Sequence, residues 1–275
     1  MTATRVCATS RAAFAFSLLA MTTGASLAAD LGYGSVKDVP PPAHSGRTFY
    51  LKGTIGVSNS DTGGLWNEAY DYGNFTVGHN DVKSAPIFGL GFGVEANRWL
   101  RLDVTGEYRG SQLLIGQDSY YTDPCSTAGN CGTNEITADI ESWVGLANAY
   151  IDLGTFRGIT PYVGGGVGFA SVSVQGLKDV NVPNNGVAFA GDHTDTNFAW
   201  ALYAGLSYDV TPQFTMDFGY RYLDLGKARS GTPQAYDPDY DCGCSAFEVK
   251  DLTSHDLLIS ARYRLNEPTP TYALK

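Results

Sequence analysis

The sequence predicts an all-β fold, an eight-stranded antiparallel up-and-down barrel, and three observations support this prediction. Apolar residues recur at every second position in eight segments, which is the period of a β-strand and not of a helix. The connections between these segments alternate between short and long. No run of about 18 apolar residues occurs, so a membrane-spanning form of this chain would have to be a closed barrel.

The composition excludes several classes of protein. With 43% hydrophobic residues, 12% aromatic residues and 33 glycines, the chain is neither disordered nor fibrous. A nucleic-acid partner would require clustered cations to neutralise phosphates, but the chain has 18 Lys and Arg against 28 Asp and Glu and a net charge of -10. The sequence therefore predicts no nucleic-acid binding.

The N-terminal 46 residues predict export followed by an extended linker. Arg5 and Arg11 precede an apolar stretch of residues 12–21, and the small residues around Ala28 complete the pattern of a secretory signal peptide, predicted as residues 1–28. The apolar stretch is too short for a transmembrane helix. Residues 29–46 contain Pro40, Pro41 and Pro42 and little to bury, so we expect a periplasmic tether there.

The eight strands are predicted over residues 49–58, 86–95, 99–109, 136–152, 161–174, 198–208, 214–222 and 253–265. The third segment shows the pattern most clearly, because Leu102 and Val104 share one face while Arg101 and Asp103 share the other.

The fourth strand, residues 136–152, shows the pattern less clearly. We expect its apolar face to carry Ile136, Ala138, Ile140, Val144 and Leu146. Trp143 and Asn148 break this alternation.

The lengths of the connections predict the topology. Residues 58–83, 110–135, 175–196 and 225–250 form long connections, whereas residues 96–98, 154–158 and 210–213 form short ones. Short turns at one rim and long loops at the other, with both termini at the short-turn rim, describe an up-and-down transmembrane barrel. Residues 47–265 therefore predict an eight-stranded transmembrane β-barrel with four long external loops and three short periplasmic turns. Residues 266–275 are expected to form a C-terminal periplasmic tail.

The distribution of charge favours a membrane barrel over a soluble lipocalin-type barrel. In the predicted register, the apolar faces of all eight strands lack Lys, Arg, Asp and Glu. Aromatic residues on those faces lie toward the strand ends, as in the interfacial girdles of membrane barrels: Phe49, Tyr108, Phe198, Tyr208, Phe214, Tyr222 and Tyr263. A soluble barrel would place its apolar face inside and its charged face in water.

The opposite face predicts a charged lumen. An eight-stranded barrel has an interior about wide enough for side chains to fill, so opposite charges there should pair as one network. The residues predicted for this lumen network are Lys52, Glu95, Arg101, Asp103, Glu107, Arg109, Asp217, Arg221, Asp256, Arg262 and Arg264.

Four cysteines follow the predicted signal peptide, and an even number in an exported chain predicts disulfides. Three pairings of Cys125, Cys131, Cys242 and Cys244 are arithmetically open, and we favour Cys125 with Cys131 because that bond closes a short loop. Cys242 and Cys244 would then bond each other or another partner. A four-thiolate metal site is the alternative, but the Cys-x5-Cys and Cys-Gly-Cys spacings do not match its usual ligand pairs.

Four segments carry a resemblance to a known family: Asn148-Ala149-Tyr150-Ile151-Asp152, Thr160-Pro161-Tyr162-Val163-Gly164-Gly165-Gly166-Val167-Gly168, Phe218-Gly219-Tyr220-Arg221-Tyr222 and Ala261-Arg262-Tyr263-Arg264-Leu265. With these segments the sequence resembles the OmpA-like transmembrane-domain and opacity-related surface antigens of the α-proteobacterial type. This resemblance implies a porin-like or surface-exposed outer-membrane barrel that in some members binds haem or host surfaces. Its implied partners are outer-membrane lipid, lipopolysaccharide and the barrel-assembly machinery. Family members commonly end on an aromatic residue, whereas here Asn266 to Lys275 follow the last strand.

Several motifs suggest chemistry but have a simpler interpretation. The glycines around Gly91 and Gly166 open no helix, so they indicate close packing of the inner wall and not a nucleotide loop. His79 and His193 in the loops could ligate haem, although loop histidines are more often solvated.

Two further motifs concern calcium and catalysis. Residues 237–241 alternate carboxylates as calcium loops do, but Gly243 comes one place late. His255 could serve a lipid-modifying enzyme as a general base, yet Thr253 and Leu257 are its neighbours on the same face and Ser254 points inward.

The functional prediction is a non-enzymatic protein of the cell outer membrane without cofactor or metal. We expect structural, envelope-integrity and surface-exposed roles, with a porin-like label from the family resemblance but a narrow lumen filled by charges. The alternatives are loop-mediated binding of haem or of a host surface, and a small-solute pore.

Overall fold

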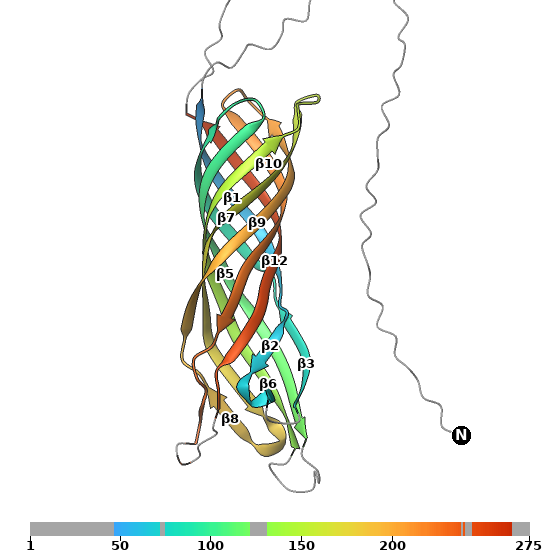
Figure 1. Cartoon of the computed structure of the whole chain (residues 1–275), viewed down its shortest axis with the longest axis vertical. Coiled ribbons are helices and arrows are strands. Elements are labelled where there is room, and N and C mark those ends of the chain that lie inside the picture. The colour runs from blue at the N-terminus through green and yellow to red at the C-terminus, as the bar shows by residue number, and fades with distance from the viewer. Residues whose placement is uncertain (1–46, 72–74, 122–130, 238, 240–243, 266–275) are drawn as a thin grey trace, which may run out of the picture. The chain divides into compact units, whose positions relative to one another are not determined.

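The computed structural model describes residues 47–71, 75–121, 131–237, 239 and 244–265 (Figure 1). The predicted signal peptide, tether and C-terminal tail lie outside these residues, as do Cys125, Cys242 and Gly243. Within the described residues, no helix is long and apolar enough to cross a bilayer.

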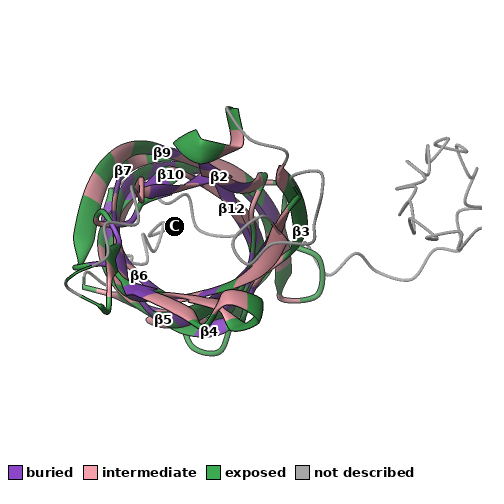
Figure 2. Ribbon diagram, turned by 90° about the horizontal axis from the view of Figure 1, so that it is seen from below, coloured by how far each residue is buried: buried purple, intermediate pink, exposed green. Residues whose placement is uncertain are grey.

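Eight long strands form a closed antiparallel ring, seen along its axis in Figure 2. They are β1 (Thr48–Asp61), β4 (Ala85–Glu95), β5 (Leu100–Tyr121), β6 (Cys131–Asp152), β7 (Ile159–Asn181), β9 (His193–Asp209), β10 (Phe214–Arg229) and β12 (Phe247–Arg264). Each strand pairs with the next long strand along the chain, and β12 pairs with β1 to close the ring. The predicted eight-stranded up-and-down barrel is confirmed.

Three tight turns join strands at one end of the barrel, as predicted. The first follows β4, where the side chain of Asn97 accepts hydrogen bonds from the backbone amides of Trp99 and Leu100 at 2.9 and 2.8 Å. The turn between β9 and β10 closes through the amide of Val210, which donates to the carbonyl of Phe214 at 2.9 Å.

The long connections contain more strand than the sequence predicted. β5, β6, β7, β10 and β12 all continue beyond their predicted bounds toward the loop end. Short elements at that end are β2 (Gly64–Asn67), η1 (Glu68–Asp71), β3 (Phe75–Val82), η2 (Val182–Asn184), β8 (Gly186–Phe189) and β11 (Gln234–Ala235), of which β2, β3 and β8 are labelled in Figure 1. β2 pairs with β12, β3 with β5, and β8 with β7 and β11, so these elements extend the wall.

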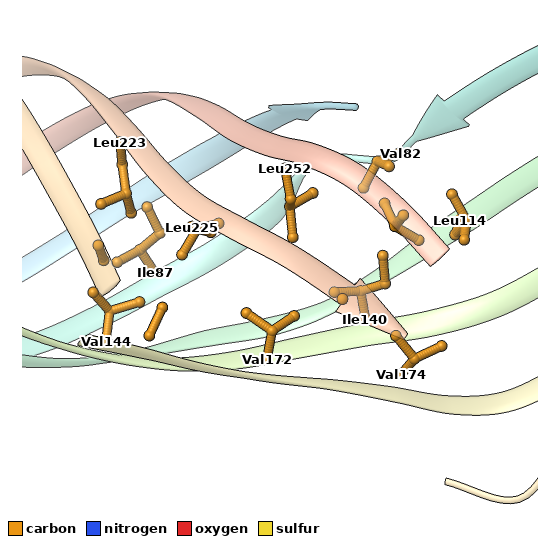
Figure 3. Close-up of a cluster of buried hydrophobic side chains, with 14 of the residues drawn as sticks. Val82, Ile87, Leu114, Ile140, Val144, Val172, Val174, Leu223, Leu225 and Leu252 are labelled. Carbon is orange, nitrogen blue, oxygen red and sulfur yellow. The ribbon is translucent and has the colours of Figure 1, made fainter. Parts of the chain in front are cut away.

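The polarity of the wall reverses along the barrel axis. Toward the short turns, apolar side chains such as Leu90 and Val104 point outward and are exposed. Toward the loops, apolar side chains turn inward and form an interior apolar cluster, shown in part in Figure 3. We define it by its buried members Val82, Ile87, Leu114, Ile136, Ile140, Val144, Val172, Val174, Leu223, Leu225 and Leu252. Shifts of strand register after Arg109 on β5 and after Asp224 on β10 accompany the reversal.

This reversal corrects the predicted orientation of residues 136–152. Ile136, Ala138, Ile140, Val144 and Leu146 were expected on the lipid-facing side, but all five are buried inside the barrel. The strand contributes to the interior apolar cluster along much of its length, so its large apolar residues point inward as members of that cluster. The two interruptions of the pattern fit this register, because Trp143 is exposed on the outer face and Asn148 is buried inside.

The outer face of β6 therefore carries charged residues. The sequence predicted that the outer faces of all eight strands lack them. Asp139 and Glu141 point outward, in the part of the strand that lies beyond Trp143. The Trp143 ring lies 5.0 Å from that of Tyr108, and Trp200 packs against Tyr222 at 5.4 Å. These pairs form an aromatic girdle, so the two carboxylates lie on its loop side, where the wall faces water.

Glycines let three interior tyrosines lie against the wall. A Cβ atom on Gly93 would overlap the Tyr50 ring, and one on Gly205 would come within 2.6 Å of the Tyr162 ring. The Tyr150 ring covers Gly164 in the same way. The glycine runs thus leave room for aromatic side chains, which agrees with the packing interpretation of these motifs.

Candidate functional site

The candidate site is the set of charged side chains inside the barrel. Each of the eleven residues predicted for the lumen network takes part in an ion pair within 4.0 Å. Most are buried, and Lys52, Glu95 and Arg264 are partly exposed. Alternation along β1, β4, β5, β10 and β12 directs these side chains inward, so the strand period alone positions them.

The centre of the network joins β5, β10 and β12. The Arg221 guanidinium donates to both carboxylate oxygens of Glu107 at 2.6 and 2.8 Å, and its Nε donates to Asp256 at 2.8 Å. Arg109 donates two hydrogen bonds of 3.0 Å to Asp256 and two more to the hydroxyls of Ser58 and Ser254. Two guanidinium groups therefore share the Asp256 carboxylate, while Glu107 neutralises the second positive charge.

A second cluster lies nearer the short turns. Arg262 donates to Asp217 at 2.7 and 3.0 Å and to Glu95 at 3.1 Å. Glu95 also accepts from Arg264 at 3.0 Å, and Arg264 contacts Asp209 at 3.2 Å. This chain of charges connects β12, β10, β4 and β9.

A third cluster surrounds Asp103. The Lys52 ammonium donates to Asp103 at 3.2 Å and to the Tyr150 hydroxyl at 3.1 Å. The Asn148 amide donates to Asp103 at 2.8 Å, and its carbonyl oxygen accepts from the Tyr203 hydroxyl at 3.0 Å.

Arg101 pairs with a different acid. Its guanidinium binds Asp152 through hydrogen bonds of 2.7 to 3.0 Å and packs over the rings of Tyr150 and Tyr162.

The arrangement crosses the barrel interior. In the ring order β1, β4, β5, β6, β7, β9, β10, β12, strands β5 and β10 lie opposite each other, four places apart in either direction. Glu107 is on β5 and Arg221 on β10, and their side chains are 4% and 0% exposed. Their two hydrogen bonds therefore join opposite walls.

Sequence reasoning missed the neutral and peripheral members of this network. Tyr50, Asn148 and Tyr150 are buried and donate hydrogen bonds to Asp103, and the buried Tyr203 hydroxyl donates to Asn148. Asp152 and Asp209 complete the pairs of Arg101 and Arg264. The sequence did indicate that Asn148 and Tyr150 point inward, because these two residues alternate with small residues on β6. The apolar side chains of Val144 and Leu146 lie on the same inward face, and they obscured this polar pattern.

The histidine and serine residues of the other predicted chemical motifs do not come together in one site. His79 and His193 are both exposed, and the His255 ring lies on the outer face beside Tyr220 and Tyr222. Ser254 points inward and binds Arg109, away from His255. The described residues contain no group of three or more His, Cys, Asp or Glu side chains that could hold a metal.

The cysteines and the acidic loop lie only partly within the described residues. Cys131 and Cys244 are disulfide-bonded, and both predicted partners lie outside those residues. In the acidic loop, the Asp239 amide donates to the Asp237 carboxylate at 3.0 Å, while Asp241 lies outside them.

Comparison with known proteins identifies the family. The family described as "Outer membrane protein beta-barrel domain" matches residues 16–264. An uncharacterized protein of Brucella suis biovar 1 is 34% identical over 217 residues, covering 72% of this chain and 74% of the relative. Outer membrane protein PagN of Salmonella typhimurium is 25% identical over 193 residues, covering 65% of this chain and 75% of its own length.

Among solved structures, the chain is similar to Neisserial surface protein A, with a TM-score of 0.44 and 17% identity over 80% of this chain and 99% of that one. OprG from Pseudomonas aeruginosa has a TM-score of 0.49 and 11% identity over 80% and 98% of the two chains. The family match and the closed ring of strands confirm the expected outer-membrane location. This chain belongs to the family of outer-membrane proteins that have a β-barrel domain.

Proposed function

We propose that this protein is a non-catalytic structural barrel of the outer membrane, with envelope-integrity and surface-exposed roles, whose lumen is closed to solutes. The observation that carries the proposal is the Glu107–Arg221 ion pair, which joins opposite strands of the ring. Outer-membrane lipid and lipopolysaccharide would surround the barrel, and the barrel-assembly machinery would insert it.

Two layers of side chains support a closed lumen. The charged layer holds its ions by multiple short hydrogen bonds, and opening a water path through it would separate Arg221 from both Glu107 and Asp256. Breaking a buried ion pair by removing one partner costs about 3–5 kcal/mol, because the other charge remains buried and unpaired.

The interior apolar cluster is the second layer. Ile87, Leu223 and Leu252 are fully buried in the barrel (Figure 3). Along their strands they lie nearer the loops than the lumen charges Glu95, Arg221 and Asp256, respectively. Hydrated ions would have to shed water to pass between such side chains, because nothing there replaces their hydration shell. The two layers together favour a structural barrel over a small-solute pore, although the family resemblance carries a porin-like label.

Conductance of the refolded protein in planar bilayers tests this proposal. We expect no large, stable conductance steps from the wild type. Replacing Asp103 and Glu107 together by Ala should destabilise the barrel and raise ion leakage, because it leaves Lys52 and Arg221 without these partners.

The matched control is the double replacement of Asp139 and Glu141 by Ala, which removes the same two residue types from the outer wall. It should leave both conductance and stability close to those of the wild type. Large, stable steps from the wild type, with the Asp103 and Glu107 replacements altering only ion selectivity, would show an open channel and would refute the structural role.

A further inference from the structure

A cavity of about 740 Å³ lies at the loop end of the barrel, apart from the charged layer. Its lining comes from β5, β6, β7 and the short elements of the loops. Three carboxylates line it, Asp118 on β5, Asp179 on β7 and Asp237 after β11. The rest of the wall includes several asparagine side chains and the aromatic side chains Tyr70, Phe75 and Tyr120.

Asp118 is fixed in place at the cavity wall. It is 1% exposed, and it accepts hydrogen bonds from the Tyr70 hydroxyl and from the Asn134 amide, the latter at 2.7 Å. These two donors are neutral, so they orient the carboxylate without cancelling its charge.

Asp179 lacks comparable partners. Its Oδ1 is buried and accepts no hydrogen bond from the described residues. The described ion pairs include neither Asp118 nor Asp179, and the described residues of the cavity lining contain no Lys, Arg or His. A buried carboxylate without a cation is costly, and it contrasts with the barrel interior, where every predicted charge is paired.

The remaining wall combines amide side chains with packed aromatic rings. The Tyr120 hydroxyl accepts from Asn181 at 3.2 Å and from Asn184 at 2.7 Å, which ties β5 to β7 and η2. The ring of Phe75 packs between those of Tyr70 and Tyr120, at 5.1 and 5.6 Å. Carboxylates combined with aromatic rings are the surroundings that attract a cation carried on an apolar stem.

We propose that this cavity binds an organic cation, an ammonium or guanidinium group on an apolar stem, through Asp118 and Asp179. The cation would come either from a small amine in the medium or from a Lys or Arg side chain of another protein. A hard metal ion fits less well, because it prefers six or more oxygen ligands and the described residues form no metal-binding cluster. The inference goes beyond the structural role, since the cavity lies outside the charged layer.

The proposed site implies a pH dependence. Burial, and then the neighbouring Asp118 charge, raise the pKa of Asp179 to about 6. Burial likewise raises the pKa of Asp118, against the hydrogen bonds from Tyr70 and Asn134. The other titratable groups of the lining are Tyr120, Tyr236 and Asp237, besides the disulfide-bonded Cys244, and none of them is a cation. The cation-binding form of the site is the ionised one, so affinity should rise as pH rises through about 6.

Isothermal titration of the refolded mature protein in detergent tests the proposal, with agmatine and a short lysine-containing peptide as probes. The wild type should bind at least one of them at pH 7.5 and bind it roughly fourfold more weakly at pH 5.5, because a smaller fraction of Asp179 is ionised there. Binding of agmatine identifies a small amine as the source, and binding of the peptide alone identifies a protein side chain.

Variants separate this site from general attraction to an acidic protein. Asp179→Asn and Asp118→Asn should each weaken binding at least tenfold, whereas Asp139→Asn, which removes the same charge from the outer wall, should change it less than twofold. The inference is wrong if neither probe binds the folded wild type at millimolar concentration, or if Asp139→Asn weakens binding as much as Asp179→Asn. These binding results do not depend on whether the barrel conducts ions. The proposed cation site and the proposed closed lumen can therefore be refuted independently of each other.

Discussion

The interior tyrosines show how single residues determine the packing of the barrel. Tyr50 is fully buried, donates a hydrogen bond to Asp103 at 3.2 Å and lies against Gly93 on the neighbouring strand. The glycine is needed because its missing side chain is the space that the ring occupies.

We therefore predict that Gly93→Ala lowers the free energy of unfolding by about 1–3 kcal/mol, the usual cost of overpacking an interior. Urea unfolding in lipid vesicles measures this. Gly53→Ala is the matched control, because a Cβ atom there meets no other atom within 4 Å and lies on the outer face of the same sheet. Equal stability of the two variants would show that the Tyr50 ring is not fixed against Gly93.

At the scale of the strand, periodicity identified all eight long strands but misjudged one orientation. On β5, the charged residues Arg101 and Asp103 share one face, so the sequence correctly predicted that this face points inward. β6 mixes inward Asn148 and Tyr150 with inward Val144 and Leu146, so hydrophobicity alone pointed to the wrong face. The parts of the strands that extend beyond the aromatic girdle were also missed. Their apolar side chains point inward and their polar side chains outward, which is the reverse of the pattern in the membrane-spanning part.

The orientation of β6 makes a testable prediction. Ala147 lies on the outer face, paired with Val104 and Val167, which are both exposed in the apolar belt. Ala147→Arg should destabilise the barrel in vesicles by about 2–4 kcal/mol, because it places a charge in lipid. Asp139→Arg, on the same face beyond the aromatic girdle, should cost less than about 1 kcal/mol. A negligible cost for Ala147→Arg would place that face away from lipid.

The loops make a second prediction at this scale. We expect a non-reduced digest to yield Cys125 linked to Cys131, with Cys242 and Cys244 linked to each other or to another partner. Mass spectrometry identifies the linked peptides, and a fully reduced digest is the control. A bond from either of the first two cysteines to either of the last two would overturn this pairing.

At the scale of the whole molecule, the sequence predicted the closed ring, the three short turns and the candidate lumen residues. It could not predict which charges meet, because Glu107 and Arg221 are 114 residues apart and become neighbours only when the ring closes. The loop-end cavity was also missed, since Asp118, Asn134 and Asp179 come from three separate strands within predicted loops.

A closed antiparallel barrel in which each long strand is paired on both sides should resist detergent until heated. The mature protein should therefore migrate differently on gels before and after boiling, and should fractionate with the outer membrane. Urea-unfolded protein is the control and should migrate alike with and without boiling. A soluble fraction without any heat-dependent shift would contradict the membrane barrel.

The central claim, that charged side chains join opposite walls of the lumen, is tested most directly by a double-mutant cycle on Glu107 and Arg221. The free energy of unfolding would be measured in vesicles for the wild type, Glu107→Gln, Arg221→Met and the double variant. We predict a coupling energy above about 1.5 kcal/mol, as for close, desolvated charge pairs. Additive effects, within about 0.5 kcal/mol, would mean that the two side chains do not interact across the lumen and would contradict this account.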